Sequence, residues 1–246
     1  MKFMKYMGSK SKISKHIVPI IQSRINEFCI STYIEPFVGG GNIIDKIVAN
    51  KKIGCDKQHY LIALYQNMEK IKTLPDFVDK QHYDDVRQSF NKKDGKYADW
   101  YVGAIGFLAS YNGRFFDGGY AGLVNTKIGT TRNYYAEAKN NLEKQIPYLQ
   151  NIEWRSGDYK DTCVGAKNCL IYCDPPYYNT KKYGVSHNFQ YDEFWAWVRK
   201  MSNENIVLIS ESTAPNDFEC VWEYPIKRTI DNAKSVQSIE RLFELK

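Results

Sequence analysis

Paired cysteines are missing from this sequence, and histidines are few. None of the six cysteines stands in a Cys-x-x-Cys arrangement, and the four histidines are scattered along the 246 residues. Structural zinc sites and disulfide frameworks depend on such clusters. We therefore expect no metal site and no disulfide framework.

Long apolar runs are missing as well. Residues 1–6 are too polar for a signal peptide, and the apolar run at residues 102–109 is too short to span a bilayer. We expect an intracellular, cytoplasmic protein that is not bound to a membrane.

Aromatic and basic residues are plentiful by contrast. Aromatic residues make up 15% of the chain, and 34 Lys and Arg against 28 Asp and Glu give a net charge of +6. This balance is a mild bias toward polyanions, and the rings suit base stacking, although most of them are expected in the core. The length and the 43% hydrophobic content indicate one α/β core with an inserted subdomain.

The most informative stretch is Asp174-Pro175-Pro176-Tyr177, which follows an apolar run at residues 169–173. The run is typical of a buried strand, and two prolines end it because neither has an N–H for the ladder. Ligands of open α/β sheets bind at the carboxyl ends of strands. The stretch therefore predicts a carboxylate, a stiffened carbonyl and an aromatic ring at a ligand site.

This group suits the activation of an exocyclic amino nitrogen on a nucleic-acid base. The lone pair of such a nitrogen is delocalised into the ring, and hydrogen bonds from its two protons to the Asp174 carboxylate and the Pro175 carbonyl would localise it. Tyr177 would stack on the base. A strand that simply ends in a proline turn explains the four residues equally well, so the rest of the chain has to decide.

A second group of motifs lies upstream. Residues 32–37 are expected to form a strand, and residues 38–42, with Gly39 and Gly41, a tight turn into a helix through residues 43–47. No Gly-Lys-Ser/Thr follows, which excludes a P-loop. A second strand at residues 52–56 ends in Asp56, which would accept the ribose hydroxyls of a nucleoside. An ordinary connection and a helix N-cap are the alternatives.

The N-terminal motif runs from Tyr6 to Lys10. Gly8 and Ser9 precede an expected helix, with Ser11 or Ser14 as its cap, and Lys10 would meet a carboxylate or phosphate. A plain basic tail is the alternative.

Residues 111–133 lack amphipathic periodicity and are expected to form a long loop or hairpin between helical segments at 75–111 and 134–148. Its rings, arginines and asparagine suit stacking into a duplex and reading base edges. A mobile surface lid is the alternative. The candidate DNA-binding residues are Tyr111, Asn112, Arg114, Lys127 and Arg132.

The remaining elements complete an α/β pattern. We expect a strand at residues 152–156, followed by Asp158 and Tyr159, a helix near 191–201 and a strand at 206–210. Residues 218–223, 226–230 and 239–245 are expected to be closing strands.

In this order the motifs resemble those of the Dam-like DNA adenine-N6 methyltransferases of alpha-type motif order, from Tyr6 to about Leu245. The resemblance implies a Rossmann-like S-adenosylmethionine-dependent methyltransferase fold. It implies a catalytic domain of residues 1–72 and 150–246 and an inserted helical and loop target-recognition subdomain of residues 73–149. Asp174, Pro175, Pro176 and Tyr177 would then grip an adenine flipped out of double-stranded DNA while its N6 takes a methyl group.

The resemblance also implies a site for S-adenosylmethionine and needs no metal. Its residues would be Tyr6, Lys10, Phe37, Gly39, Gly41, Asp56, Asp158 and Tyr159. Family members that recognise GATC carry a Thr-Pro-Phe-Gly-like segment that residues 125–132 do not match, so the target sequence stays open. We expect a monomer that partners duplex DNA. The alternatives are methylation of cytosine N4 or of RNA, and a non-catalytic nucleic-acid-binding module.

Overall fold

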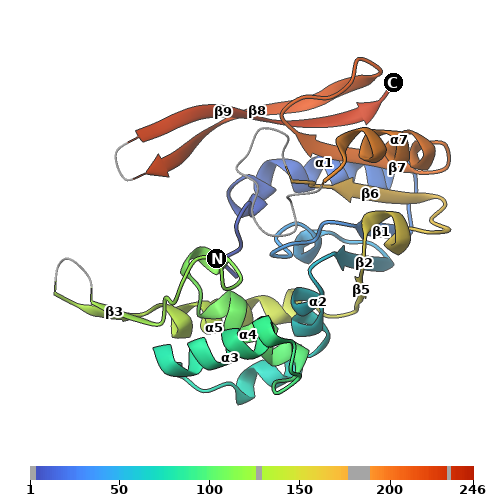
Figure 1. Ribbon diagram of the computed structural model, residues 1–246. Helices are drawn as coiled ribbons and strands as arrows, with labels where there is room; N and C mark the ends of the chain where they lie inside the picture. The colour runs from blue at the N-terminus through green and yellow to red at the C-terminus, as the bar shows by residue number, and fades with distance from the viewer. Residues whose placement is uncertain (1–3, 126–128, 177–188, 232–233) are drawn as a thin grey trace.

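The structure is a computed structural model. It describes residues 4–125, 129–176, 189–231 and 234–246, and of residues 227–231 and 234–237 it describes the backbone alone. A seven-stranded sheet runs through this part of the chain (Figure 1). In spatial order its strands are β5 (Ile152–Ser156), β2 (Lys51–Asp56), β1 (Thr32–Glu35), β6 (Cys169–Cys173), β7 (Ile206–Glu211), β9 (Lys234–Leu245) and β8 (Phe218–Asp231).

The first five strands in this order are parallel. Thr32 of β1 pairs with Lys51 of β2 on one side and with Cys169 of β6 on the other. β9 joins the parallel part through an antiparallel pairing with β7, and β8 pairs with β9 at the edge of the sheet formed by the described residues. The prediction of a mixed α/β fold around a central, mostly parallel sheet is therefore confirmed.

Both faces of the sheet are buried, which explains the continuous apolar run of β6. Leu170 and Tyr172 belong to one apolar cluster, while Cys169, Ile171 and Cys173 belong to a second. Side chains alternate between the faces of a strand, so the two clusters lie on opposite sides of the sheet.

Helices supply the other half of each cluster. The first cluster takes buried residues from α1 (Ser14–Glu27), which follows η1 (Lys10–Lys12), and from α2 (His59–Gln66), which continues into η3 (Met68–Thr73). The second takes buried residues from α6 (Tyr159–Thr162) and α7 (Tyr191–Ser202).

The segment between η3 and β5 adds no strand to the seven-stranded sheet within the described residues. It contains helices α3 (Lys80–Lys92), α4 (Asp99–Leu108) and α5 (Tyr134–Gln145), the short turns η4 (Tyr111–Gly113) and η5 (Ile146–Tyr148), and a hairpin of β3 (Leu123–Asn125) and β4 (Thr131–Asn133). The β3–β4 hairpin and the far end of the β8–β9 hairpin extend toward the same side of the molecule in Figure 1.

Three expectations were wrong in detail. Residues 43–47 form only the single turn η2 (Ile44–Lys46), because their isoleucines are buried on every side and β2 begins a few residues later. Neither Ser11 nor Ser14 caps α1; instead, Ser9 accepts a hydrogen bond from the Ser11 N–H and caps η1.

The third correction concerns the closing strands. Residues 218–223 and 226–230 form one strand, β8, that passes through Pro225. An edge strand such as β8 tolerates a proline because alternate N–H groups of its backbone face away from the sheet.

Two further properties follow from the described residues. No helix among them is long and apolar enough to cross a membrane. All six cysteines are free thiols.

Candidate active site

The strand order reverses between β1 and β6, and we refer to the region outside the carboxyl ends of these two strands as the crevice. From β1 the chain proceeds outward through β2 to β5, whereas β6 and β7 lie on the opposite side of β1. Ligands of open α/β sheets bind at such a switch point, outside the carboxyl ends of the strands. Asp174 follows β6, the glycine turn follows β1, Asp56 ends β2 and Asp158 follows β5, so the predicted site residues meet at this edge.

The glycine turn depends on its glycines for two reasons. Gly39 and Gly41 have φ angles of +47° and +64°, which disfavour other residues. Tyr6 lies directly on the turn, since a Cβ at either Gly39 or Gly40 would come within 2.9 Å of its side chain. The Tyr65 hydroxyl donates to the Gly39 carbonyl at 2.7 Å and holds the turn from the other direction.

Asp56 fixes the start of this turn. Its Oδ2 accepts a hydrogen bond from the Gly39 N–H at 3.0 Å, and its Oδ1 accepts one from the Gln58 N–H at 2.9 Å. Burial raises the pKa of this carboxyl, and the backbone N–H groups oppose that rise. The N-cap residue of α2 is Gln58 and not Asp56. The Asp56 carboxylate nevertheless accepts hydrogen bonds from both the glycine turn and the residue that caps α2.

Asp174 forms an ion pair with Lys10. The Lys10 Nζ lies 2.7 Å from Asp174 Oδ1 and 3.6 Å from Glu240 Oε2, and the side chains of Lys10 and Asp174 are only 9% and 19% exposed. The ammonium therefore balances two carboxylates at the crevice. Lys10, predicted near the methionine part of the donor, also draws η1 onto the end of β6.

Tyr6 connects the two acidic residues. Burial raises the pKa of its hydroxyl well above the usual value, and the charges of Asp56 and Asp174 raise it further. Both carboxylates are therefore close enough to act on the same hydroxyl. Asp174 thus lies at the same edge of the sheet as the glycine turn and Asp56.

The remaining predicted catalytic residues are only partly described. Pro175 is buried, and the Pro176 carbonyl accepts a hydrogen bond from the Tyr191 hydroxyl at 2.6 Å, which anchors the turn to α7. Tyr177 lies outside the described residues.

A cluster of aromatic rings lies near the carboxyl ends of β1 and β5. The Phe37 ring lies 5.4 Å from the ring of Tyr159 and 5.9 Å from that of Phe194. Tyr159 is buried, and this raises its pKa to about 12. Asp158 caps α6 through the Lys160 N–H and lies 3.3 Å from the Lys57 ammonium.

The sequence interpretation did not single out Glu35, a buried carboxyl at the same edge of the sheet. It ends β1, is 3% exposed and accepts a 2.6 Å hydrogen bond from the Tyr33 hydroxyl. Burial raises its pKa well above the usual value, and the charges of Asp45 and Asp174 raise it further. The usable signal was an acidic residue at a strand end, the same signal that identified Asp56 and Asp174.

Glu35→Gln is expected to remove a pH dependence of stability. Because folding raises the Glu35 pKa, the folded state holds a proton that the unfolded state releases above pH 4.5, and the free energy of unfolding falls as pH rises. Glutamine resembles the protonated form, so the variant should gain stability over the parent protein between pH 5 and pH 8. Denaturant unfolding at several pH values measures this, with exposed Glu69→Gln as control. Parallel curves for parent and Glu35→Gln would contradict it.

The candidate DNA-binding residues lie on η4 and the β3–β4 hairpin. Tyr111 is 58% exposed, and the neighbouring Asn112 has a positive φ of 54°. Gly113 packs so closely on the Lys5 carbonyl that a Cβ would collide with it. The η4 turn therefore lies against the N-terminal segment that covers the glycine turn.

The basic candidates already have acidic neighbours. Arg132 binds Glu137 through two hydrogen bonds of 2.8 and 2.6 Å and lies over the Tyr134 ring. Arg114 lies 3.6 Å from Asp117. Lys127 lies outside the described residues. In the part of the chain that the structure describes, no group of three His, Cys, Asp or Glu side chains is arranged to hold a metal ion.

Comparison with known proteins gives consistent matches. The model of a family described as D12 class N6 adenine-specific DNA methyltransferase matches residues 6–213. Type II methyltransferase M.MjaIII of Methanocaldococcus jannaschii is 26% identical over 200 residues, covering 71% of this chain and 68% of that protein. Type II methyltransferase M.FokI of Planomicrobium okeanokoites is 25% identical over 193 residues, and the match covers 71% of this chain but only 28% of that protein. A DNA adenine methylase of Salmonella typhi is 30% identical over 163 residues, or 58% of this chain and 55% of that protein.

Proposed function

Because this chain belongs to the D12 class N6 adenine-specific DNA methyltransferase family, we propose that it transfers a methyl group from S-adenosylmethionine to N6 of an adenine in duplex DNA. The observation that carries the proposal is that Asp174, Asp56 and the glycine turn lie at the carboxyl ends of adjacent strands, at one edge of the sheet. An amine-activating carboxylate and a nucleoside site must adjoin for such a transfer. We assign the fold as Rossmann-like, of the S-adenosylmethionine-dependent methyltransferase type.

The crevice fits this methyl donor. Gly39 and Gly41 leave the backbone of the turn open to close approach, and Asp56 retains oxygen lone pairs for the ribose hydroxyls. The rings of Phe37 and Tyr159 offer an apolar wall for an adenine ring, with Asp158 at its border. Tyr6 and Lys10 cover the remaining side. When bound, S-adenosylmethionine supplies an electrophilic methyl group on a positively charged sulfur.

Asp174 and Pro175 act on the amino group of the target base. Hydrogen bonds from the two N6 protons to the Asp174 carboxylate and the Pro175 carbonyl localise the nitrogen lone pair, which forms the new N–C bond. The electron pair of the broken S–C bond stays on sulfur, and one N6 proton leaves to Asp174. Lys10 holds the carboxylate in place through its 2.7 Å ion pair.

The segment of residues 73–149 is the proposed target-recognition subdomain, with residues 1–72 and 150–246 as the catalytic domain. Exposed Tyr111 and Asn112 would enter or read the duplex, and Arg114, Lys127 and Arg132 would contact base edges or phosphates. Arg132 would have to exchange Glu137 for DNA. We propose a monomer that acts on DNA in the cytoplasm; the six free thiols support a reducing compartment.

A single labelling experiment tests this function. The protein is incubated with unmethylated duplex DNA and S-adenosylmethionine labelled in its methyl group, and the DNA is digested to nucleosides. We expect the label in N6-methyladenosine nucleosides of duplex DNA. Label in N4-methylcytosine, label only with RNA, or DNA binding without label would each contradict the proposal and favour one of the alternatives.

A further inference from the structure

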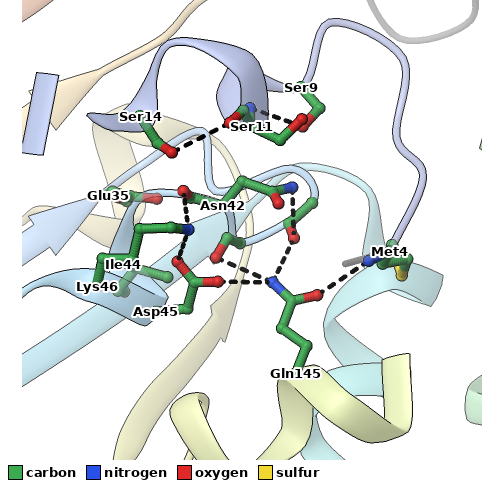
Figure 2. Close-up of polar contacts among 12 residues, drawn as sticks. Met4, Ser9, Ser11, Ser14, Glu35, Asn42, Ile44, Asp45, Lys46 and Gln145 are labelled. Carbon is green, nitrogen blue, oxygen red and sulfur yellow. Dashed lines mark hydrogen bonds and ion pairs between the residues drawn. The ribbon is translucent and has the colours of Figure 1, made fainter. Parts of the chain in front are cut away.

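Gln145 is a fully buried polar residue that the proposed chemistry does not use. It is the last residue of α5 and is 0% exposed. Figure 2 shows its side chain pointing out of α5 toward the glycine turn and Met4. A buried amide in this position requires several hydrogen-bond partners.

The Gln145 side chain has these partners on two other segments. Its Nε2 donates to the carbonyls of Gly40 and Gly41 at 3.1 and 3.2 Å and lies 3.1 Å from Asp45 Oδ2. Its Oε1 accepts a hydrogen bond from the Met4 N–H at 3.2 Å. One side chain thus joins α5, the glycine turn and the N-terminal segment (Figure 2).

Neighbouring side chains hold these partners in place. The Lys46 ammonium contacts Asp45 Oδ1 at 2.6 Å and donates to the Asn42 carbonyl at 2.7 Å. The Asn42 amide donates to the Gly40 carbonyl at 3.1 Å. The turn is therefore held by its own side chains, by Tyr65 and Asp56, and by Gln145, which adds the contact from α5.

The other end of α5 meets the proposed DNA-reading hairpin. Asn133, the last residue of β4, caps the helix by accepting a hydrogen bond from the Ala136 N–H. The 12 residues of α5 form a rod of about 18 Å. Buried Lys139 ties the middle of this rod to the Leu74 carbonyl and to Asp76, each at 2.8 Å.

We infer that Gln145 is a positioning residue that couples the target-recognition segment to the methyl-donor site. If α5 shifts when duplex DNA binds, the Gln145 amide would transmit this movement to the carbonyls of Gly40 and Gly41. The inference rests on the proposed function, because it assigns the hairpin to DNA and the turn to the donor. Coupling between two binding sites is reciprocal, so the duplex should change donor affinity by the same factor as the donor changes duplex affinity.

Calorimetry with S-adenosylhomocysteine as the probe tests the inference. Its Kd is measured with and without unmethylated duplex for the parent protein, Gln145→Leu and Gln145→Glu, with Gln150→Leu as control. Gln150 bears the same amide, but it is exposed, and within the described part of the chain its amide donates to the Ile146 carbonyl of its own turn. For both Gln145 variants we expect Kd without DNA to rise about 10-fold and the duplex effect to fall toward none. The donor KM should rise more than kcat falls.

The outcomes separate this inference from the proposed function. A parent protein that neither binds the probe nor labels DNA would overturn both. An active parent protein with the duplex effect retained in the Gln145 variants, or with no duplex effect at all, would overturn the coupling alone. If Gln145→Leu does not fold, Gln145→Met, which keeps the length of the side chain and lacks its amide, gives the same readout.

Discussion

Replacing Asp174 by asparagine is expected to lower kcat for methyl transfer by about three orders of magnitude, as the loss of a preorganised electrostatic group does. The asparagine amide oxygen can accept a hydrogen bond from N6, but the neutral amide cannot take up the proton that N6 releases. Donor binding should remain measurable, since the proposed donor site is formed by the glycine turn and Asp56. Single-turnover transfer to duplex DNA and calorimetry with S-adenosylhomocysteine measure the two effects separately.

The control for this substitution is Asp192→Asn, on the exposed first turn of α7. It changes the same chemical group away from the crevice and should transfer methyl groups at the parent rate. Lys10 lies 3.6 Å from Glu240 in the parent protein and would retain this partner in the Asp174 variant, so thermal unfolding should show a folded protein. Normal turnover by folded Asp174→Asn would refute the mechanism.

Replacing Asp56 by alanine is expected to raise the donor KM by about 10- to 100-fold, as the loss of hydrogen bonds to a charged group does. The substitution removes the proposed acceptor of the ribose hydroxyls. It also leaves the Gly39 N–H without its 3.0 Å carboxylate partner, which loosens the turn. The decrease in kcat at saturating donor should be smaller. Initial rates over a range of donor concentrations give both constants.

Asp161→Ala is the matched control for Asp56→Ala. Asp161 lies on α6 at the same edge of the sheet, but its side chain is exposed. The donor KM of the Asp161→Ala variant should equal that of the parent protein. An unchanged donor KM for Asp56→Ala, or a loss confined to kcat, would contradict the assignment of Asp56 to the donor.

Several parts of the site were predictable because their signals are local. An apolar run followed by an acidic residue marks the ends of β2 and β6, and parallel strands bring these ends to one edge. Asp56 and Asp174 were identified in this way. Glu35 also follows apolar residues at the end of a strand. The sequence interpretation assigned a role to the glycine turn that follows Pro36 and none to Glu35.

Other parts could not be predicted because their partners are distant in the sequence. Nothing near Lys10 announces its ion pair with Asp174, and nothing near Gln145 announces its bonds to the glycine turn. The isoleucines of residues 43–47 suggested a helix, because burial on every side looks like helical spacing in so short a segment. Tertiary packing decided all three.

The position of β1 between β2 and β6 has a consequence for the folding of the chain during its synthesis on the ribosome. β2 follows β1 closely, but its other neighbour, β6, is made only after α5 and β5 have been translated. Pairings this distant in sequence slow folding, and an unpaired strand edge invites association with other chains. The crevice is thus assembled late, and a nascent chain that stops before Cys173 carries β1 with one edge open.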